Sequence, residues 1–243
     1  MHPERMERIV RPEILDELSA DDPRAVQSRR DLRKINAFMG HAAMVAHELR
    51  AGAAGARRIV ELGAGDGTLL LRVATRLGRS TEGVQATLVD RRPSITGQTR
   101  ASFKELGWTV EEAACDVFEW LQRPGIATAD AAIANLFLHH FEDAPLASLL
   151  DGLAKRTRLF IACEPRRSRA GLAGVSLMPL IGCNAVTLHD GDISVRAGFR
   201  DRELSRLWPA AQGWHLDERR AGLFTHLFVA RITAARGLSV SAG

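Results

Sequence analysis

Two adjacent histidines and one glutamate are the residues of this sequence best suited to proton transfer. His139 and His140 follow an apolar run that predicts a strand, and Glu164 follows the next predicted strand. An unperturbed imidazole titrates near neutral pH, so either ring could take a proton from a reacting group. A carboxylate beside it would orient the ring and stabilise its charged form. The pattern predicts a His–Glu pair, leaves open which histidine takes part, and allows Glu164 to pair with Arg166 or Arg167 instead.

A glycine-rich turn is the second candidate for chemistry. The run Glu61-Leu62-Gly63-Ala64-Gly65-Asp66-Gly67 stands between a predicted strand and a predicted helix. Glycines there allow a sharp turn and let a ligand approach the main chain, because no side chain fills the space. The spacing G-x-G-x-G after an acid differs from the G-x-G-x-x-G of dinucleotide-binding folds. An ordinary turn hardly needs three alternating glycines, so we predict a ligand-binding turn.

Two acidic residues follow the next predicted strands. Asp90 closes the second strand, where a carboxylate can accept hydrogen bonds from a pair of hydroxyl groups. The alternative for Asp90 is a turn residue at a strand end. Asp116 follows the third strand, and it is equally suited to cap the short helix that begins at Val117.

The elements that must position these residues alternate along the chain from residue 58 on. Short apolar runs predict strands, and the amphipathic segments between them predict helices. The predicted strands cover 59–62, 86–89, 109–113, 130–134 and 158–163, and the helices cover 68–77, 100–106, 143–155 and a segment from about 201. Residues 214–218 and 224–231 predict an antiparallel pair at a sheet edge. We expect an α/β fold with a mainly parallel, seven-stranded, doubly wound sheet and an antiparallel edge strand, whose strand ends gather the candidate residues.

The flanking segments predict three further parts. Residues 1–56 predict an N-terminal helical cap, in which Asp22 caps a helix, Pro23 begins it and Gly40 interrupts it. Apolar residues at helical spacing predict its buried face: Val26, Leu32, Ile35, Phe38 and Met39. We expect the main domain over 57–232 and a loose C-terminal tail over 233–243.

A long connection, residues 166–200, predicts a lid-like insertion in the main domain. Together with the N-terminal helices it would roof the pocket of an acceptor, and its apolar content indicates a largely apolar acceptor. Three of its residues are candidate substrate contacts, namely His189, Met178 and Asn184, and His189 is also a second candidate base. The alternative for this stretch is a covering helix with a solvated turn.

The glycine turn resembles the nucleotide-binding motif of the class I S-adenosylmethionine-dependent methyltransferases, the seven-stranded Rossmann-like type. The resemblance covers about residues 58–231. It implies S-adenosylmethionine as cofactor and S-adenosylhomocysteine as product, with Asp90 at the ribose and Asp116 and Val117 at the adenine. The cofactor-binding residues that it implies are Glu61, Gly63, Ala64, Gly65, Gly67, Asp90, Arg91, Asp116, Val117, Asn135 and Leu136.

The His-His pair after the fourth strand resembles that of small-molecule methyltransferases, including sugar O-methyltransferases, in which a histidine deprotonates the accepting hydroxyl. The opening run 11–16 is similar to the start of bacterial methyltransferases encoded beside type III polyketide synthases. These resemblances imply catalytic roles for His139, His140 and Glu164, and a phenolic or polyketide-like acceptor from secondary metabolism. Carbon or nitrogen as the methylated atom stays open. Two other classes of protein stay open. One is an RNA or protein methyltransferase, although the run 135–138 lacks the prolines typical of amine methylation. The other is a non-catalytic cofactor-binding partner subunit.

Composition narrows the class of protein. Of 243 residues, 46% are hydrophobic and 26% charged, which suits one globular domain. The three cysteines form no CxxC pair, so we expect neither a disulfide framework nor a zinc site but a cytoplasmic protein. No apolar run is long enough to span a membrane. The net charge is +4, but the cationic residues are scattered and tyrosine is absent, which argues against nucleic acid as a partner. We expect no metal, a small-molecule acceptor and a possible homodimer.

Overall fold

One seven-stranded sheet organises the molecule. The computed structural model describes residues 6–19, 21–125, 127–209 and 213–233. The strand order is β3-β2-β1-β4-β5-β7-β6, and the bounds are β1 Arg58–Leu62, β2 Gln85–Asp90, β3 Thr109–Ala114, β4 Ala131–Asn135, β5 Leu159–Pro165, β6 Trp214–Ala221 and β7 Thr225–Ile232. Strands β1 to β5 pair in parallel, whereas β7 pairs antiparallel with both β5 and β6. The predicted mainly parallel sheet, closed at one edge by an antiparallel pair, is confirmed.

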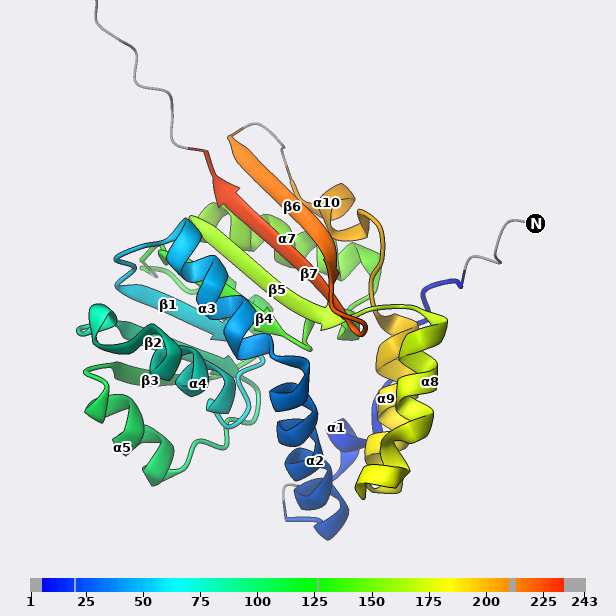
Figure 1. Ribbon diagram of the computed structural model, residues 1–243. Coiled ribbons are helices and arrows are strands. Elements are labelled where there is room, and N and C mark those ends of the chain that lie inside the picture. Colours follow the sequence, from blue (N-terminus) through cyan, green and yellow to red (C-terminus); the bar gives the residue numbers. More distant parts are fainter. Residues whose placement is uncertain (1–5, 20, 126, 210–212, 234–243) are drawn as a thin grey trace, which may run out of the picture.

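Helices cover both faces of this sheet (Figure 1). One face carries α3 (His41–Gly52), α4 (Thr68–Leu77) and α5 (Gly97–Glu105), and the other carries α6 (Val117–Gln122), α7 (Asp143–Arg156) and α10 (Glu203–Leu207). Two short 3-10 helices, η1 (Gly78–Thr81) and η2 (Leu138–His140), follow α4 and β4. The central strands β4 and β5 are buried on both sides, which explains why they read as apolar runs rather than as alternating ones.

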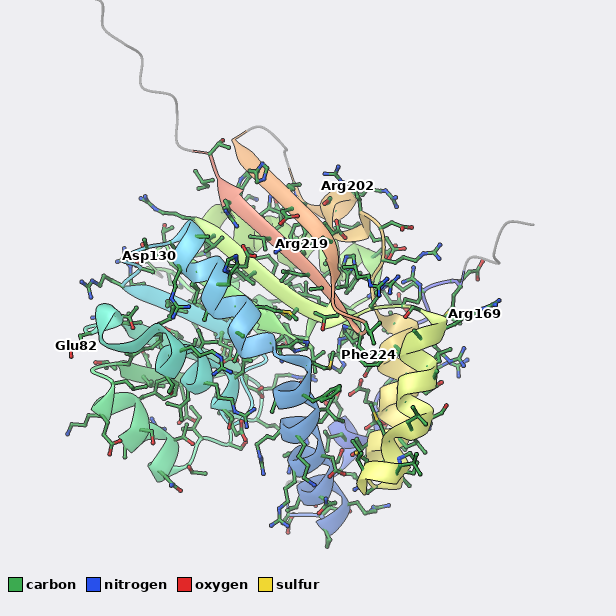
Figure 2. The ribbon with its side chains drawn as sticks, in the orientation of Figure 1. Glu82, Asp130, Arg169, Arg202, Arg219 and Phe224 are labelled. Carbon is green, nitrogen blue, oxygen red and sulfur yellow. The ribbon has the colours of Figure 1, made fainter. Side chains whose placement is uncertain are left out.

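The remaining helices lie together beyond one end of the sheet (Figure 1): α1 (Ile14–Glu17), α2 (Pro23–Met39), α8 (Arg169–Leu177), η3 (Met178–Ile181) and α9 (Ala185–Ala197). The predicted lid-like insertion is therefore the helical pair α8 and α9, and α9 packs against α1 and α2. Figure 2 shows Phe224, from the turn between β6 and β7, beside α8. No helix in the described parts of the chain is long and apolar enough to cross a membrane.

Helix α2 begins and ends as predicted, but its buried face is different. The Asp22 side chain accepts a hydrogen bond from the Arg24 N–H, and Gly40 ends the helix in a left-handed conformation with φ of 71°. Of the five apolar residues at helical spacing, Phe38 is 82% exposed and the other four are half-buried, whereas the fully buried residues of α2 are Ala25, Ser28 and Asp31. Ser28 and Asp31 hydrogen-bond to Thr187 of α9, so polar contacts rather than apolar burial fix the contact between these helices.

The predicted cap, residues 1–56, divides between two environments. Its last helix, α3, is buried against α4 through Val45, Ala46 and Leu49, inside the same core as the sheet. Only the part before Gly40 lies beyond the sheet edge. Apart from Thr233, the predicted tail 233–243 falls outside the described residues.

Candidate active site

The candidate residues gather at the carboxyl edge of the parallel strands. The glycine turn follows β1, Asp90 ends β2, Asn135 ends β4, and Glu164 is the last residue but one of β5. Strands β1 and β4 are neighbours, and the chain leaves them toward opposite faces of the sheet. A crevice between such strands is where open α/β sheets bind ligands.

The three positions of the glycine turn require glycine for two different reasons, backbone conformation and packing. Gly63, Gly65 and Gly67 all have positive φ angles, of 63°, 54° and 69°, which a side chain would strain. A Cβ atom on Gly65 would meet nothing within 4 Å, whereas one on Gly63 would lie 2.4 Å from the Phe137 ring. At Gly67 the Cβ position lies 3.0 Å from the Leu88 side chain, so packing excludes a side chain at Gly63 and Gly67, and the approach of a ligand to the three glycines stays a prediction. Of the three glycines, Gly65 alone faces open space.

Glu61 is a buried carboxyl group beside this turn. It is 2% exposed, and its Oε2 atom has no hydrogen-bond partner among the described residues. Burial, together with the charges of Asp66 and Asp90, raises the pKa of Glu61 well above its usual value. A buried oxygen without a partner is costly, so this position suits a ligand that brings a donor or a positive charge.

The two aspartates after β2 and β3 are both fixed by backbone N–H groups. Asp90 accepts from the Gly65 N–H at 2.8 Å and from the Arg92 N–H at 2.7 Å, which ties the glycine turn to the end of β2. Each carboxylate oxygen can accept a second hydrogen bond, so the predicted ribose contact stays compatible with this geometry. Asp116 caps α6 by accepting from the Phe118 N–H at 2.8 Å, which is the alternative that the sequence allowed for it.

The other predicted cofactor residues line the same edge. Ala64 and Val117 are buried, while Arg91 is exposed next to Asp90. The Asn135 Oδ1 atom is buried, and the side chain that interacts with it is that of the buried His41. Burial lowers the pKa of His41, and the interaction with Asn135 opposes this larger effect. Leu136 has a φ of 51°, a left-handed conformation that is uncommon without glycine and that often marks a functional site. Their roles toward a cofactor stay predictions.

Glu164 holds the segment after β4. Its Oε1 atom accepts from the Phe137 and Leu138 N–H groups at 3.0 and 2.9 Å, and its Oε2 atom accepts from the His139 N–H at 3.3 Å. Oε2 also lies 2.8 Å from His139 Nδ1. The predicted contact between Glu164 and one of the two histidines is present, and the histidine is His139. The competing pairing with Arg167 is absent, because that guanidinium binds Glu203 instead.

A second carboxylate, which sequence reasoning missed, lies on the other side of His139. Glu13 Oε1 is 3.4 Å from His139 Nε2, so the ring stands between Glu13 and Glu164. Burial lowers the pKa of His139, but the hydrogen bonds and charges of the two carboxylates outweigh it and raise the pKa to about 9. His139 is therefore an imidazolium at neutral pH, with no lone pair to accept a further proton.

His140 is the opposite case. Its ring lies against that of His139, with 4.3 Å between the ring centroids and an angle of 32° between the ring planes. Burial and the positive charge of His139 lower the pKa of His140, so its ring is neutral at neutral pH. No described side chain hydrogen-bonds to it, since the nearest carboxylate, that of Asp16, is 3.8 Å from Nδ1. Of the two histidines between which the sequence could not choose, His140 is the one able to accept a proton.

Two contacts hold Glu13 in place. Asp190 of α9 accepts from the backbone N–H groups of Ile14 and Leu15, at 2.9 and 3.0 Å, and so fixes the start of α1. The Ser194 hydroxyl donates to Glu13 itself. The only sequence signal for Glu13 is its place in the opening run 11–16, which by itself assigns it no role.

Two arginines fasten the same N-terminal segment to the domain. Arg8 donates to the carbonyl oxygens of Ala197 and Phe141, at 2.8 and 2.7 Å. Arg167 donates to the Met6 carbonyl at 2.9 Å. These hydrogen bonds hold the N-terminal segment that carries Glu13 against the end of α9 and the residue that follows η2.

The three predicted substrate contacts of the insertion do not converge. His189 is exposed on α9. Asn184 caps α9 by accepting from the Thr187 N–H and donates to the Arg24 carbonyl of α2, so its polar atoms are engaged in joining two helices. Met178 is half-buried and lies against Gly191 of α9. Their roles toward a substrate stay predictions without direct support.

Glu13, His139 and His140 also form a set that could hold a metal ion. Among the residues that the structure describes, their ligand atoms lie within 4.8 Å of one another. Sequence reasoning saw no such set, because Glu13 is remote in the chain. The geometry fits either a proton on His139 between Glu13 and Glu164 or a metal ion held by Glu13, His139 and His140.

Neither a protein-family model nor a curated protein matches this sequence. Solved structures do match the fold. The plantazolicin methyltransferase BpumL, solved with S-adenosylhomocysteine, gives a TM-score of 0.61 over 88% of this chain and 92% of its own, at 10% identity. The magnesium protoporphyrin IX methyltransferase of Synechocystis gives 0.53 over 84% and 86%, at 14% identity.

The mitomycin 7-O-methyltransferase MmcR gives a TM-score of 0.55 at 18% identity, over 89% of this chain but 60% of its own. At these identities the likeness establishes the fold and nothing finer. The strand order and the matches together define it as the seven-stranded Rossmann-like fold of class I methyltransferases, as the resemblance implied.

Proposed function

We propose that the protein transfers a methyl group from S-adenosylmethionine to a hydroxyl group of a small, largely apolar acceptor, of a phenolic or polyketide-like kind. One observation carries the proposal. After the end of β4, the neutral His140 ring lies against the tilted ring of His139, which is fixed between Glu13 and Glu164. The Phe137 ring of the same segment lies against Gly63, so the histidines stand beside the glycine turn.

The residues around the glycine turn fit the cofactor. The open space at Gly65 allows close approach to the main chain. The unpartnered oxygen of Glu61 suits the ammonium group of its amino-acid end, and Asp90 retains acceptor capacity for ribose hydroxyls. When bound, S-adenosylmethionine supplies an activated methyl group.

His140 acts as the general base in this proposal. A neutral hydroxyl is a poor nucleophile until its proton is removed, and the His140 ring has a lone pair to take that proton. Asp16, 3.8 Å from Nδ1, favours the charged ring that results. The side chain is 27% exposed, which lets the proton leave to solvent. Glu13, Glu164 and His139 are positioning residues, because they fix the ring on which His140 rests.

Aromatic side chains beside the histidines support an apolar acceptor. Phe137 and Phe141 meet edge to face at 5.2 Å, and Phe118 meets Phe141 at 5.6 Å. All three are half-buried and so present partly open apolar surface next to His140. Such rings favour flat or apolar ligands over charged ones.

The test has two stages. Calorimetry with S-adenosylhomocysteine should show binding, and the cofactor with a labelled methyl group should then label alkylphenols but not their methyl ethers. Absence of binding in the folded protein would overturn the proposal entirely. Binding without transfer to any hydroxyl would instead point to the non-catalytic alternative, and labelling of anilines in place of phenols would move the reaction to nitrogen.

A further inference from the structure

Exposed aliphatic side chains gather at the junction of α8 and η3. Residues 170–188 contain no charged residue and no histidine. Within this stretch Leu177, Leu180 and Ile181 are 59%, 80% and 63% exposed. Val175 and Met178 of the same turns pack inward against Gly191 of α9. The side chains of Leu177, Leu180 and Ile181 therefore point outward and take no part in the packing between α8 and α9.

A cationic stripe of α2 lies next to this junction. The Asn184 amide donates to the Arg24 carbonyl at 2.8 Å, which joins the end of η3 to α2. Burial raises the pKa of the Cys183 thiol and the positive charge of Lys34 acts to lower it, so Lys34 is close to this thiol, two residues after Ile181. Along α2, Arg30, Lys34 and Phe38 are spaced by four residues and share one face, and all three are exposed. In Figure 1 the ends of α2 and α8 that lie farthest from the sheet are on the same side of the molecule.

We infer that this docking surface, made of Arg30, Lys34, Leu177, Leu180 and Ile181, binds an anionic lipid bilayer. Aliphatic side chains at a helix junction enter the boundary between headgroups and acyl chains, and the neighbouring cations attract anionic headgroups. Asp31, the one acid within α2, is buried and pairs with Lys34 at 3.7 Å, so Arg30 is the cation of the stripe whose charge this acid leaves free for headgroups, while the Lys34 side chain stays 63% exposed. The inference is independent of the proposed reaction.

Charge favours a membrane over a second copy of the chain. A twofold contact through this surface would place Arg30 and Lys34 of one copy either against the same residues of the other copy or against its aliphatic side chains, and neither arrangement pairs the cations with an acid. The apolar part contains no acid to neutralise them. An anionic bilayer satisfies both the cations and the aliphatics at once.

The experiment is vesicle flotation of the full chain. Vesicles of phosphatidylcholine with about one third phosphatidylglycerol should carry the protein, pure phosphatidylcholine vesicles should carry far less, and raising salt from about 0.1 M to about 0.5 M should weaken the binding. The double variant Leu180→Glu with Ile181→Glu should lower the partition coefficient by about tenfold or more. Arg30→Glu with Lys34→Glu should do the same on anionic vesicles alone.

The matched control is Ile232→Glu, an apolar residue 48% exposed at the far end of β7. It should bind vesicles like the unchanged protein. The heat of S-adenosylhomocysteine binding and the melting temperature check that each variant is folded. No flotation with anionic vesicles, or equal loss in Ile232→Glu, would overturn the inference. So would a dimer in solution that the Leu180→Glu, Ile181→Glu variant dissociates, because the surface would then bind a second copy.

Discussion

The two halves of the carboxyl edge are built in different ways. The half around β1 and β2 takes its glycine turn and Asp90 from one short stretch of chain, and a single hydrogen bond from the Gly65 N–H joins them. The half around β4 and β5 joins Glu13 to Ser194, which are 181 residues apart, and places His139 between Glu13 and Glu164. A site made from one continuous stretch carries its pattern in the sequence, whereas an assembled site depends on the fold.

The largest expected effect separates the two histidines of the assembled half. His140→Gln should lower kcat by about 10²- to 10⁴-fold, because it removes the base, while the affinity for S-adenosylhomocysteine changes little. His139→Gln should instead lower the melting temperature, because two buried carboxylates lose their shared partner. Steady-state kinetics, calorimetry and thermal melts distinguish these outcomes.

His47→Gln is the control for these variants, because His47 is exposed on α3. It should match the unchanged protein in all three measurements. Turnover within about twofold in His140→Gln would refute the base assignment. A large loss of kcat in His189→Gln would instead make His189, in the insertion, the general base.

The sequence predicts the continuous half and the strands well, for a physical reason. Buried parallel strands must be apolar runs, and the turn after β1 needs glycines because its φ angles are positive. The sequence also places Glu164 near the histidines, since adjacent parallel strands end at one edge. It does not reveal Glu13, because α1 owes its position to Asp190 and Arg8 rather than to any local pattern.

Helix α2 shows the same limit. Its apolar spacing predicts a face toward the core, but the face that is buried consists of Ser28, Asp31 and Ala25. Thr187 of α9 supplies hydrogen bonds that no pattern within α2 can reveal. Where polar contacts between distant segments replace apolar burial, helical spacing alone does not identify the residues that become fully buried.

The second prediction compares two glycines of the continuous half. Gly63→Ala should destabilise the fold by about 2 to 4 kcal/mol, because a Cβ at positive φ also meets the Phe137 ring. Gly65→Ala should cost about 1 to 2 kcal/mol, since only the backbone conformation is strained. Urea unfolding measures the difference in the free energy of unfolding between the two variants. Gly65→Ala should lose more affinity for S-adenosylhomocysteine, and equal stabilities for both variants would contradict the packing argument.

The third prediction uses pH to test the imidazolium between its carboxylates. A pKa raised from 6.5 to about 9 means that His139 stabilises the fold fully below pH 6.5 and loses this contribution as the pH rises through 9. The pKa of Glu13 is lowered from 4.5 to about 2, because the hydrogen bond and charge of His139 overcome the opposing effect of burial, so its share is fully present above pH 4.5 and is lost as the pH falls from there through 2. Glu13→Gln should therefore be destabilising by on the order of 1 to 2 kcal/mol near neutral and mildly acidic pH, and by less above pH 9.

Urea unfolding of the two proteins across this pH range gives the difference directly. Glu7→Gln, exposed in the same segment, is the matched control and should follow the unchanged protein throughout. A Glu13→Gln difference that does not depend on pH would mean that His139 is not charged in the folded protein.

The smallest expected effect concerns whether Glu13, His139 and His140 hold a metal ion. If a proton alone satisfies Glu13 and Glu164, incubation with a chelator should change neither turnover nor melting temperature, and added Zn²⁺ should compete with that proton only as the pH rises. Elemental analysis of the purified protein, with and without chelator, checks the first part. Stoichiometric zinc that a chelator removes together with activity would replace the imidazolium by a metal centre on Glu13, His139 and His140. His139 would then be a metal ligand, and His140 would have no free lone pair with which to act as a base.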